Sequence, residues 1–265
     1  MYGPITLAFK YLRYLLTAAN GKGHGVHSPF IFEFITRVLN DNRRFYAFDG
    51  IEKIRTQLLS NHNSIEIQDF GAGSRVSKNN TRKVSDVAKG SLKPAKYSQL
   101  LFRMIDYYLP AQIVELGTSL GITTAYLASA NSSAKVTTFE GSRAIAQIAR
   151  QNHQSSGLSN ISLIEGNFDE QFPKWLENNK TVDFAFIDGN HLYKPTLAYF
   201  EALLDVVEDH SILVFDDIHW SKEMEEAWVQ ISGHPRVTLS IDLFFIGIVF
   251  FRKEFAQKQQ VSIKF

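Results

Sequence analysis

The sequence predicts an α/β fold: a mostly parallel, seven-stranded, Rossmann-like doubly wound sheet that ends in an antiparallel hairpin. From residue 112 onward, short apolar runs alternate with segments whose apolar residues have helical spacing. This alternation favours a parallel sheet with helices on both faces. The last two apolar runs, residues 237–242 and 244–251, are separated by one residue, which is typical of an antiparallel pair.

The expected elements follow from this spacing. Strands are predicted at residues 113–116, 135–140, 161–165, 182–187, 211–215, 237–242 and 244–251. Helices are predicted from residue 122 and at residues 95–109, 142–155, 173–178, 195–206 and 221–231. Together they predict a core domain over residues 95–265.

Composition limits the class of protein. The 265 residues are 45% apolar and 21% charged, carry a net charge of +1 and contain no cysteine. A net charge this small gives no general attraction for nucleic acid. No run of about 18 uncharged apolar residues is present, so no membrane span is expected. Lys10 and Arg13 interrupt the apolar start, which favours an amphipathic helix over a signal peptide and predicts a cytoplasmic location.

The first 64 residues are predicted to form a helical N-terminal cap. Helices are expected at residues 4–19, from Ser28-Pro29 onward, and at residues 49–60. Serine before proline is a common helix start, because the serine caps and the proline fits the first turn. The apolar first helix could pair with a second copy of the chain, so a homodimer is one expectation.

Residues 65–94 are predicted to form a short strand and a basic loop. The strand, residues 65–70, precedes a second glycine turn at residues 71–74. Residues 75–96 then hold seven Lys or Arg and one acid, Asp86. A solvated loop, a lid over an active site and a basic patch for an anionic substrate are three interpretations of this segment.

The stretch of residues 112–128 combines a buried strand, a glycine turn and a helix. Glu115 lies within the strand, Gly117 and Gly121 form the turn, and the helix begins at Ile122. Such a turn directs backbone N–H groups at a ligand. The dinucleotide fingerprint has three glycines spaced G-x-G-x-x-G, whereas this turn has two spaced G-x-x-x-G.

The E-x-G-x-x-x-G pattern resembles the first motif of class I S-adenosylmethionine-dependent methyltransferases. Glu140 follows Glu115 by 25 residues, and an acid there can accept both hydroxyls of a ribose, in this cofactor or in NAD. The resemblance implies that Asn167 and Phe168 lie against adenine, and that Glu115 fixes the turn or reaches the methionine amino group indirectly. The implied cofactor-binding residues are Glu115, Gly117, Thr118, Ser119, Gly121, Glu140, Gly141, Asn167, Phe168 and Asp188.

Acids follow two further predicted strands. Asp188 comes after one strand, and Asp216 and Asp217 come at the end of the next. Converging carboxylates repel one another, and a hard cation such as Mg²⁺ relieves this. The arrangement resembles metal-dependent O-methyltransferases of the catechol and macrolide-sugar types, which implies Mg²⁺ ligation by these three acids. In a second interpretation, Asp216 or Asp217 only caps the following helix.

His191 is the predicted general base, with Asp188 as the second catalytic residue. His191 stands three residues after Asp188, where the macrolide-sugar type has a histidine and the catechol type a lysine. Histidine suits proton removal near neutral pH. His219 is a rival for the same role.

These residues predict Mg²⁺-assisted O-methylation of a small hydroxylated molecule. The basic segment leaves an RNA or protein methyltransferase open, although the predicted fourth strand ends in Asp-Gly-Asn-His, not in the loop of many amide-nitrogen enzymes. The glycine turn and Glu140 are also compatible with a nucleotide-dependent oxidoreductase and with a non-catalytic S-adenosylmethionine-binding protein. Neither a nucleic acid nor a membrane is an expected partner.

Overall fold

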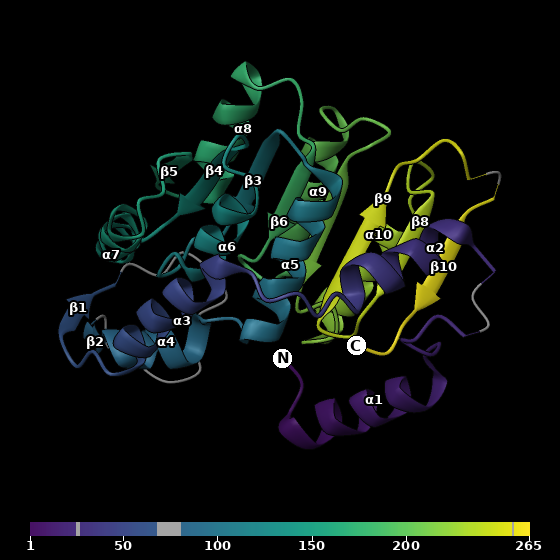
Figure 1. The fold of residues 1–265 in the computed structure, drawn as a ribbon, viewed down its shortest axis with the longest axis horizontal. Coiled ribbons are helices and arrows are strands. Elements are labelled where there is room, and N and C mark those ends of the chain that lie inside the picture. The colour runs from purple at the N-terminus through teal and green to yellow at the C-terminus, as the bar shows by residue number, and fades with distance from the viewer. Residues whose placement is uncertain (25–26, 68–80, 256) are drawn as a thin grey trace. The chain divides into compact units, whose positions relative to one another are not determined.

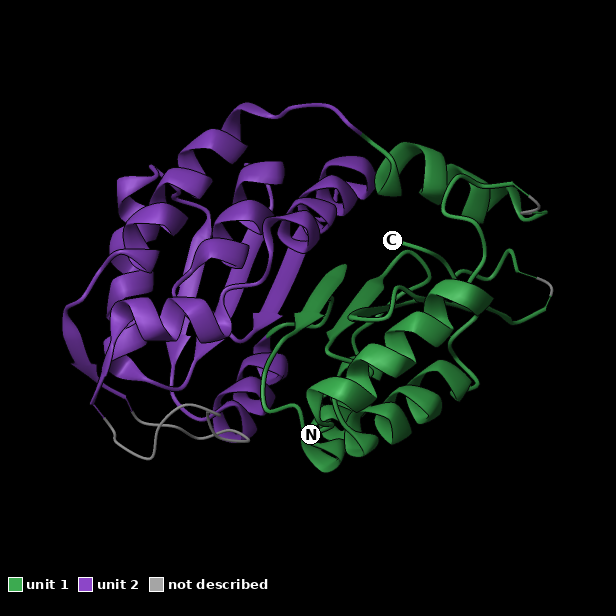
Figure 2. Ribbon diagram, turned by 90° about the horizontal axis from the view of Figure 1, so that it is seen from below, with its two compact units in different colours: residues 1–41, 179–265 green, residues 42–178 purple. Residues whose placement is uncertain are grey.

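A computed structural model describes residues 1–24, 27–67, 81–255 and 257–265. The chain folds into two compact units, which are green and purple in Figure 2. Figure 1 labels the helices and strands. One unit is the continuous segment 42–178. The other is built from both ends of the chain, residues 1–41 and 179–265.

The unit of residues 42–178 contains three parallel strands in the order β3-β4-β5. The strands are β3 (Gln112–Leu116), β4 (Lys135–Glu140) and β5 (Ile161–Glu165), with a separate antiparallel pair of β1 (Ser64–Glu66) and β2 (Thr81–Lys83). The helices are α3 (Tyr46–Leu59), α4 (Val84–Ser91), α5 (Ala95–Tyr108), α6 (Ile122–Ala130), α7 (Arg143–Ser155) and α8 (Phe168–Asn178).

A core of aromatic side chains holds the helices of this unit together. Phe48 of α3 and Phe102 of α5 lie edge to face at 4.9 Å between ring centroids. Both rings also contact Tyr126 of α6, which is fully buried. The Tyr126 hydroxyl donates a 2.7 Å hydrogen bond to Glu52 of α3. The helix that follows the glycine turn is therefore fixed by two helices that precede it in the sequence.

The unit of residues 1–41 and 179–265 contains five strands in the order β10-β8-β9-β7-β6. They are β6 (Phe184–Ile187), β7 (Ile212–Asp216), β8 (Leu239–Asp242), β9 (Ile246–Phe250) and β10 (Gln259–Ser262). β6 and β7 are parallel, β9 is antiparallel to β7 and β8, and β10 is parallel to β8. The helices are α1 (Pro4–Thr17), α2 (Pro29–Glu33), the π-helix η1 (Phe34–Leu39), α9 (Tyr193–Leu204) and α10 (Lys222–Gly233).

The predicted fold class is confirmed, including parallel strands and an antiparallel closing hairpin. The seven predicted strands are found, and β10 adds one that the sequence did not predict. Among the described residues, no helix is both long enough and apolar enough to cross a membrane. The predicted cap supplies its first helices to one unit and α3 to the other. The division into cap, loop and core stays a prediction.

The basic loop prediction was wrong for residues 81–91, which form β2 and α4. Val84, Val87 and Ala88 are buried, and their spacing places them on one side of a helix. The surrounding lysines and arginines obscure this short apolar pattern in the sequence. The second glycine turn and residues 75–80 lie outside the described residues.

Candidate active site

The backbone of the glycine turn is tied to the neighbouring strand. The N–H groups of Gly117 and Thr118 both donate to the carbonyl of Phe139 in β4, at 3.1 and 2.9 Å. Gly117, Ser119 and Gly121 all have positive φ angles, of 111°, 48° and 82°. A non-glycine residue such as Ser119 adopts this conformation at a cost, which is common where backbone approaches a ligand.

Glu140, the predicted ribose-binding acid, is held at the end of β4 by two backbone N–H groups. Ser119 donates to one carboxylate oxygen and Ser142 to the other, each at 2.9 Å. The carboxylate is therefore fixed beside the glycine turn before any ligand arrives, with Gly141 between Glu140 and the α7 cap residue Ser142.

Glu115 lies beneath the turn and is fully buried. One of its oxygens accepts hydrogen bonds from Thr124 and, at 2.6 Å, from Thr138. Thr118 in turn contacts Thr138 through their hydroxyls at 2.6 Å. The other Glu115 oxygen has no hydrogen-bond partner among the described residues. Burial raises the pKa of Glu115 to about 7, against the opposing effect of the two threonine hydroxyls.

Two residues of α7 support the turn, and the sequence pattern indicated neither of them. The Asn152 amide donates to the carbonyl of Leu120 at 2.9 Å, and Nε2 of His153 lies 3.1 Å from the carbonyl of Gly121. Burial lowers the pKa of His153 to about 4, so the ring is neutral and Nε2–H is the donor. No motif marks these residues, because their partners are backbone carbonyls distant in the sequence.

Asn167 directly precedes α8, and Phe168 is the first residue of that helix. The Asn167 side chain accepts the N–H of Asp169 at 3.1 Å, and its carbonyl accepts the N–H of Gln171 at 2.9 Å. Phe168 is the half-buried first residue of the helix. The backbone of Gly166 also bonds to the carbonyl of Glu140, at 3.0 Å. These bonds order the segment next to Glu140, and its predicted contact with adenine stays a prediction.

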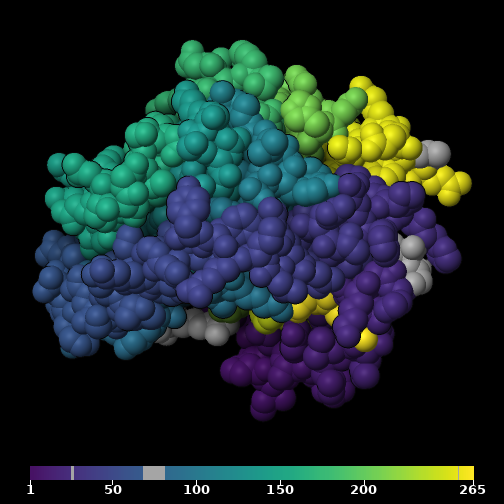
Figure 3. Space-filling view, in the orientation of Figure 1, coloured from purple at the N-terminus to yellow at the C-terminus, as the bar shows by residue number. Residues whose placement is uncertain are grey.

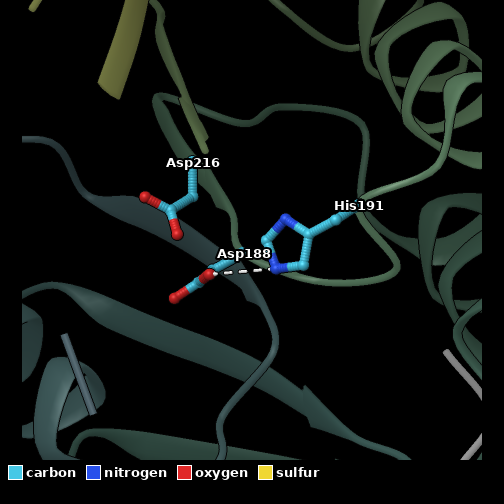
Figure 4. Close-up of side chains that lie close together, drawn as sticks. All are labelled: Asp188, His191 and Asp216. Atoms are coloured by element: carbon cyan, nitrogen blue, oxygen red, sulfur yellow. Dashed lines mark ion pairs between the residues drawn. The ribbon is translucent and has the colours of Figure 1, made fainter. Parts of the chain in front are cut away.

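In the other unit, Asp188 directly follows β6 and Asp216 is the last residue of the neighbouring parallel strand β7. Ile187 pairs in register with Phe215, so the acids that come next in each chain segment are adjacent. Asp188, His191 and Asp216 converge, and Figure 4 shows the three side chains directed toward one another. One ligand atom from each lies within 4.8 Å of the others, and His191 Nε2 is 3.6 Å from Asp188 Oδ1. Asp216 is buried and the other two are partly exposed.

The backbone around this group is strained. Asn190, His191 and Asp217 have positive φ angles of 69°, 43° and 54°. Asn190 Nδ2 donates to the Tyr199 hydroxyl at 2.8 Å, which anchors the loop to α9. Clusters of such residues outside glycine are characteristic of functional sites.

The predicted metal ligands Asp188 and Asp216 are brought together, whereas Asp217 is not part of the group. The Asp217 backbone bonds to Phe245 and Trp220 instead. Two ligands of Mg²⁺ lie at most about 4.2 Å apart, twice the usual ~2.1 Å bond, so the observed group needs only a small closure. The two carboxylates thus fit a divalent cation, with water completing the coordination, and the imidazole of His191 lies beside them.

His219, the rival base, has a different role. Its Nδ1 lies 3.0 Å from Glu225 and its Nε2 lies 2.9 Å from Asp242, so both ring nitrogens face carboxylates. Burial alone would lower the pKa of His219, but these two acids outweigh it and raise the pKa. Both ring nitrogens of His219 are therefore engaged by carboxylates of its own unit, which favours a structural role.

Known proteins similar to this chain include methyltransferases. Residues 114–218 match the family described as "Methyltransferase domain". An O-methyltransferase from Bacillus cereus in complex with S-adenosylhomocysteine (SAH) is 19% identical over 83% of this chain and 97% of that one, with a TM-score of 0.55. SAH-bound PaMTH1 from Podospora anserina is 13% identical over 85% and 97%, with a TM-score of 0.59. TomG, a Streptomyces achromogenes O-methyltransferase of tomaymycin synthesis, is 18% identical over 62% and 82%, with a TM-score of 0.53.

No curated protein sequence matches the chain. At these identities the solved structures show the fold, and the family match adds the kind of domain. The resemblance predicted from the glycine turn is confirmed. Residues 114–218 match a methyltransferase domain, and the fold of the chain is that of these solved methyltransferases.

Proposed function

We propose that this protein transfers the methyl group of S-adenosylmethionine to an oxygen of a small hydroxylated molecule, assisted by a divalent cation. The observation that carries the proposal is the convergence of Asp188, His191 and Asp216 after two adjacent strands. Structural neighbours described as O-methyltransferases, with S-adenosylmethionine or SAH bound, support the same chemistry.

The unit of residues 42–178 would hold the methyl donor. Glu140 would accept the ribose hydroxyls, because its carboxylate is already oriented by Ser119 and Ser142. Gly117 leaves the backbone open to close approach, and Thr118 and Gly121 complete the turn. The sulfonium is activated by its own charge, so the protein has to bind and align it rather than activate it.

Asp188 and Asp216 would hold the cation, whereas Asp217, the third predicted ligand, lies outside their group. A bound Mg²⁺ would lower the pKa of an acceptor hydroxyl. His191 would receive the proton of that hydroxyl, because its ring lies at the same group and a neutral imidazole accepts protons near neutral pH. The acceptor class that fits is a molecule with neighbouring hydroxyls, such as a catechol or a sugar diol.

The experiment is a methyl-transfer assay with labelled S-adenosylmethionine and a panel of catechols and sugar diols. We expect transfer to oxygen that needs Mg²⁺, is lost with chelator and returns when Mg²⁺ is restored. Asp216→Asn should reduce transfer by at least about tenfold while SAH binding, measured by calorimetry, is kept. Transfer that is indifferent to chelator and to this substitution would refute the role of the cation. SAH binding without transfer to any oxygen acceptor would favour a non-catalytic protein.

A further inference from the structure

The N-terminal helix α1 has apolar residues on two opposite sides. On its inner side, Tyr14 and Ala18 pack with Phe244 in a buried cluster, and the Tyr14 hydroxyl donates to the carbonyl of Ile263. On its outer side, Ile5, Phe9, Leu12 and Leu16 are 87%, 74%, 53% and 76% exposed. Figure 3 shows this purple N-terminal segment at the surface of the molecule. The outer residues form a line that this chain leaves uncovered within the part that the structure describes.

The four outer residues form one narrow stripe, which we call the α1 stripe. At about 100° per residue, they fall within roughly 60° of the helix circumference. Their spacing of four, three and four residues is that of a coiled-coil seam rather than of a broad lipid-facing surface. The helix is firmly held on its inner side, since Lys10 and Tyr2 both bond to Glu225, at 2.9 and 2.7 Å. The stripe therefore keeps a fixed orientation.

We infer that the α1 stripe is the contact surface for a second copy of this chain, in an antiparallel, two-fold arrangement. The spacing of four, three and four residues is the same from either end of the helix. A two-fold axis at the middle of the stripe therefore pairs Ile5 with Leu16 of the second copy. The same axis pairs Phe9 with Leu12. An isologous interface requires this reciprocity, in which each pair occurs twice.

Charge is compatible with the same arrangement. Within the described residues of α1 the charged side chains are Lys10 and Arg13, and Lys10 already pairs with Glu225. The two-fold axis places Arg13 opposite Ala8 of the second copy, so no like charges meet. A membrane-surface helix gains about 1 kcal/mol per flanking cation, and Arg13 alone supplies little such attraction. Charge therefore favours a second copy over a lipid surface.

The exposed area is sufficient for a weak, specific dimer. At these exposures the four side chains leave roughly 500 Å² uncovered in each copy, and an apolar patch of that size on a monomer commonly marks a contact site. Two copies would bury roughly 1,000 Å², the lower limit for a specific interface. We therefore expect a dimer that dissociates on dilution into the micromolar range.

The test is sedimentation equilibrium of the full chain over micromolar to submillimolar concentrations. Phe9→Lys and Leu12→Glu, made separately, should each raise the dissociation constant at least about tenfold, because each buries a charge against an apolar partner. An equal mixture of the two variants should dimerise again, since the new ammonium of one faces the new carboxylate of the other. Thr6→Lys, on the same helix away from the stripe, should dimerise like the wild type.

Thermal unfolding midpoints close to that of the wild type would show that these exposed substitutions leave the fold intact. The inference is overturned if either single variant dimerises like the wild type, or if the mixture associates no better than its components. It is also overturned if the wild-type chain is monomeric throughout, whether or not it co-sediments with phosphatidylglycerol vesicles. The experiment measures the dissociation constant of the dimer and no enzymatic activity, so its outcome is independent of the proposed methyl transfer.

Discussion

At the scale of single residues, His153, His191 and His219 differ in what their ring nitrogens contact. His219 faces two carboxylates, which raise its pKa. His153 is buried and donates to one backbone carbonyl, so it is held neutral. His191 lies beside Asp188, belongs to the same group as Asp216 and is 26% exposed. This position at the candidate metal group is why His191, of these three, is the proposed base.

His191→Gln should lower kcat by roughly 10²–10⁴-fold with little change in SAH affinity, because it removes the proton acceptor and leaves the donor site intact. The acidic limb of the pH–rate profile should disappear with it. The measurement is kcat from pH 5.5 to pH 9, with His210→Gln, at an exposed histidine, as the matched control. An unchanged pH profile would exclude His191 as the base.

Glu115 should make stability depend on pH. Its pKa rises on folding from 4.5 to about 7, so the folded state favours the protonated acid. This contribution is complete below pH 4.5 and is lost as pH rises through 7, up to about 3 kcal/mol in total. Urea unfolding from pH 5 to pH 8 should show the wild type losing stability relative to Glu115→Gln. A constant difference between the two proteins would contradict the buried, protonated acid.

At the scale of elements, the glycine turn shows what a sequence can and cannot reveal. The strand, turn and helix at residues 112–128 were predictable, because apolar spacing and glycine positions are local signals. The supports of the turn, Asn152 and His153, were not, because they come from α7 and bond to backbone. The group of Asp188 and Asp216 was predictable from neighbouring strand ends, whereas the exclusion of Asp217 depends on a loop conformation.

Gly121→Ala should impair both stability and cofactor binding. Gly121 has a φ of 82°, and an added Cβ would lie 2.4 Å from Nε2 of His153. We expect a loss of roughly 2–4 kcal/mol, which combines backbone strain with the clash. Gly157→Ala is the matched control, because its φ is 68° and nothing lies within 4 Å of the added Cβ, so only about 1–2 kcal/mol is lost.

The double variant Gly121→Ala/His153→Ala separates the two causes. If the clash contributes, the double variant should lose less free energy of unfolding than the sum of the losses in the two single variants, since the added Cβ then meets no ring. Urea unfolding measures the stabilities, and calorimetry with SAH measures binding. Strict additivity would mean that strain alone accounts for the loss.

At the scale of the whole molecule, the two units carry different parts of the proposed reaction. The glycine turn and Glu140 belong to residues 42–178, and the group of Asp188, His191 and Asp216 belongs to the unit made from both chain ends. The sequence did not reveal this division. The spacing of apolar residues predicts individual helices and strands, but it does not predict which of them pack together in one compact unit.

Because the two groups of residues belong to different units, their ligands should stabilise the protein independently. SAH at about 100 times its dissociation constant should add about 2.7 kcal/mol to the free energy of unfolding, and Mg²⁺ should add its own increment. Asp216→Asn should abolish the Mg²⁺ increment and keep that of SAH, as measured by thermal unfolding. Loss of both increments would mean that this substitution acts through the fold rather than through the metal.

The construction of one unit from both ends of the chain has a consequence for synthesis on the ribosome. Residues 42–178 form a continuous segment, so all parts of their unit emerge one after another. Residues 1–41 emerge first, yet their unit is completed only by residues 179–265. Tyr14 and Ala18, which pack against Phe244 in the finished protein, must therefore stay without that partner until most of the chain has been translated. During that interval the apolar residues of both sides of the later α1 helix lack their partners in the finished protein.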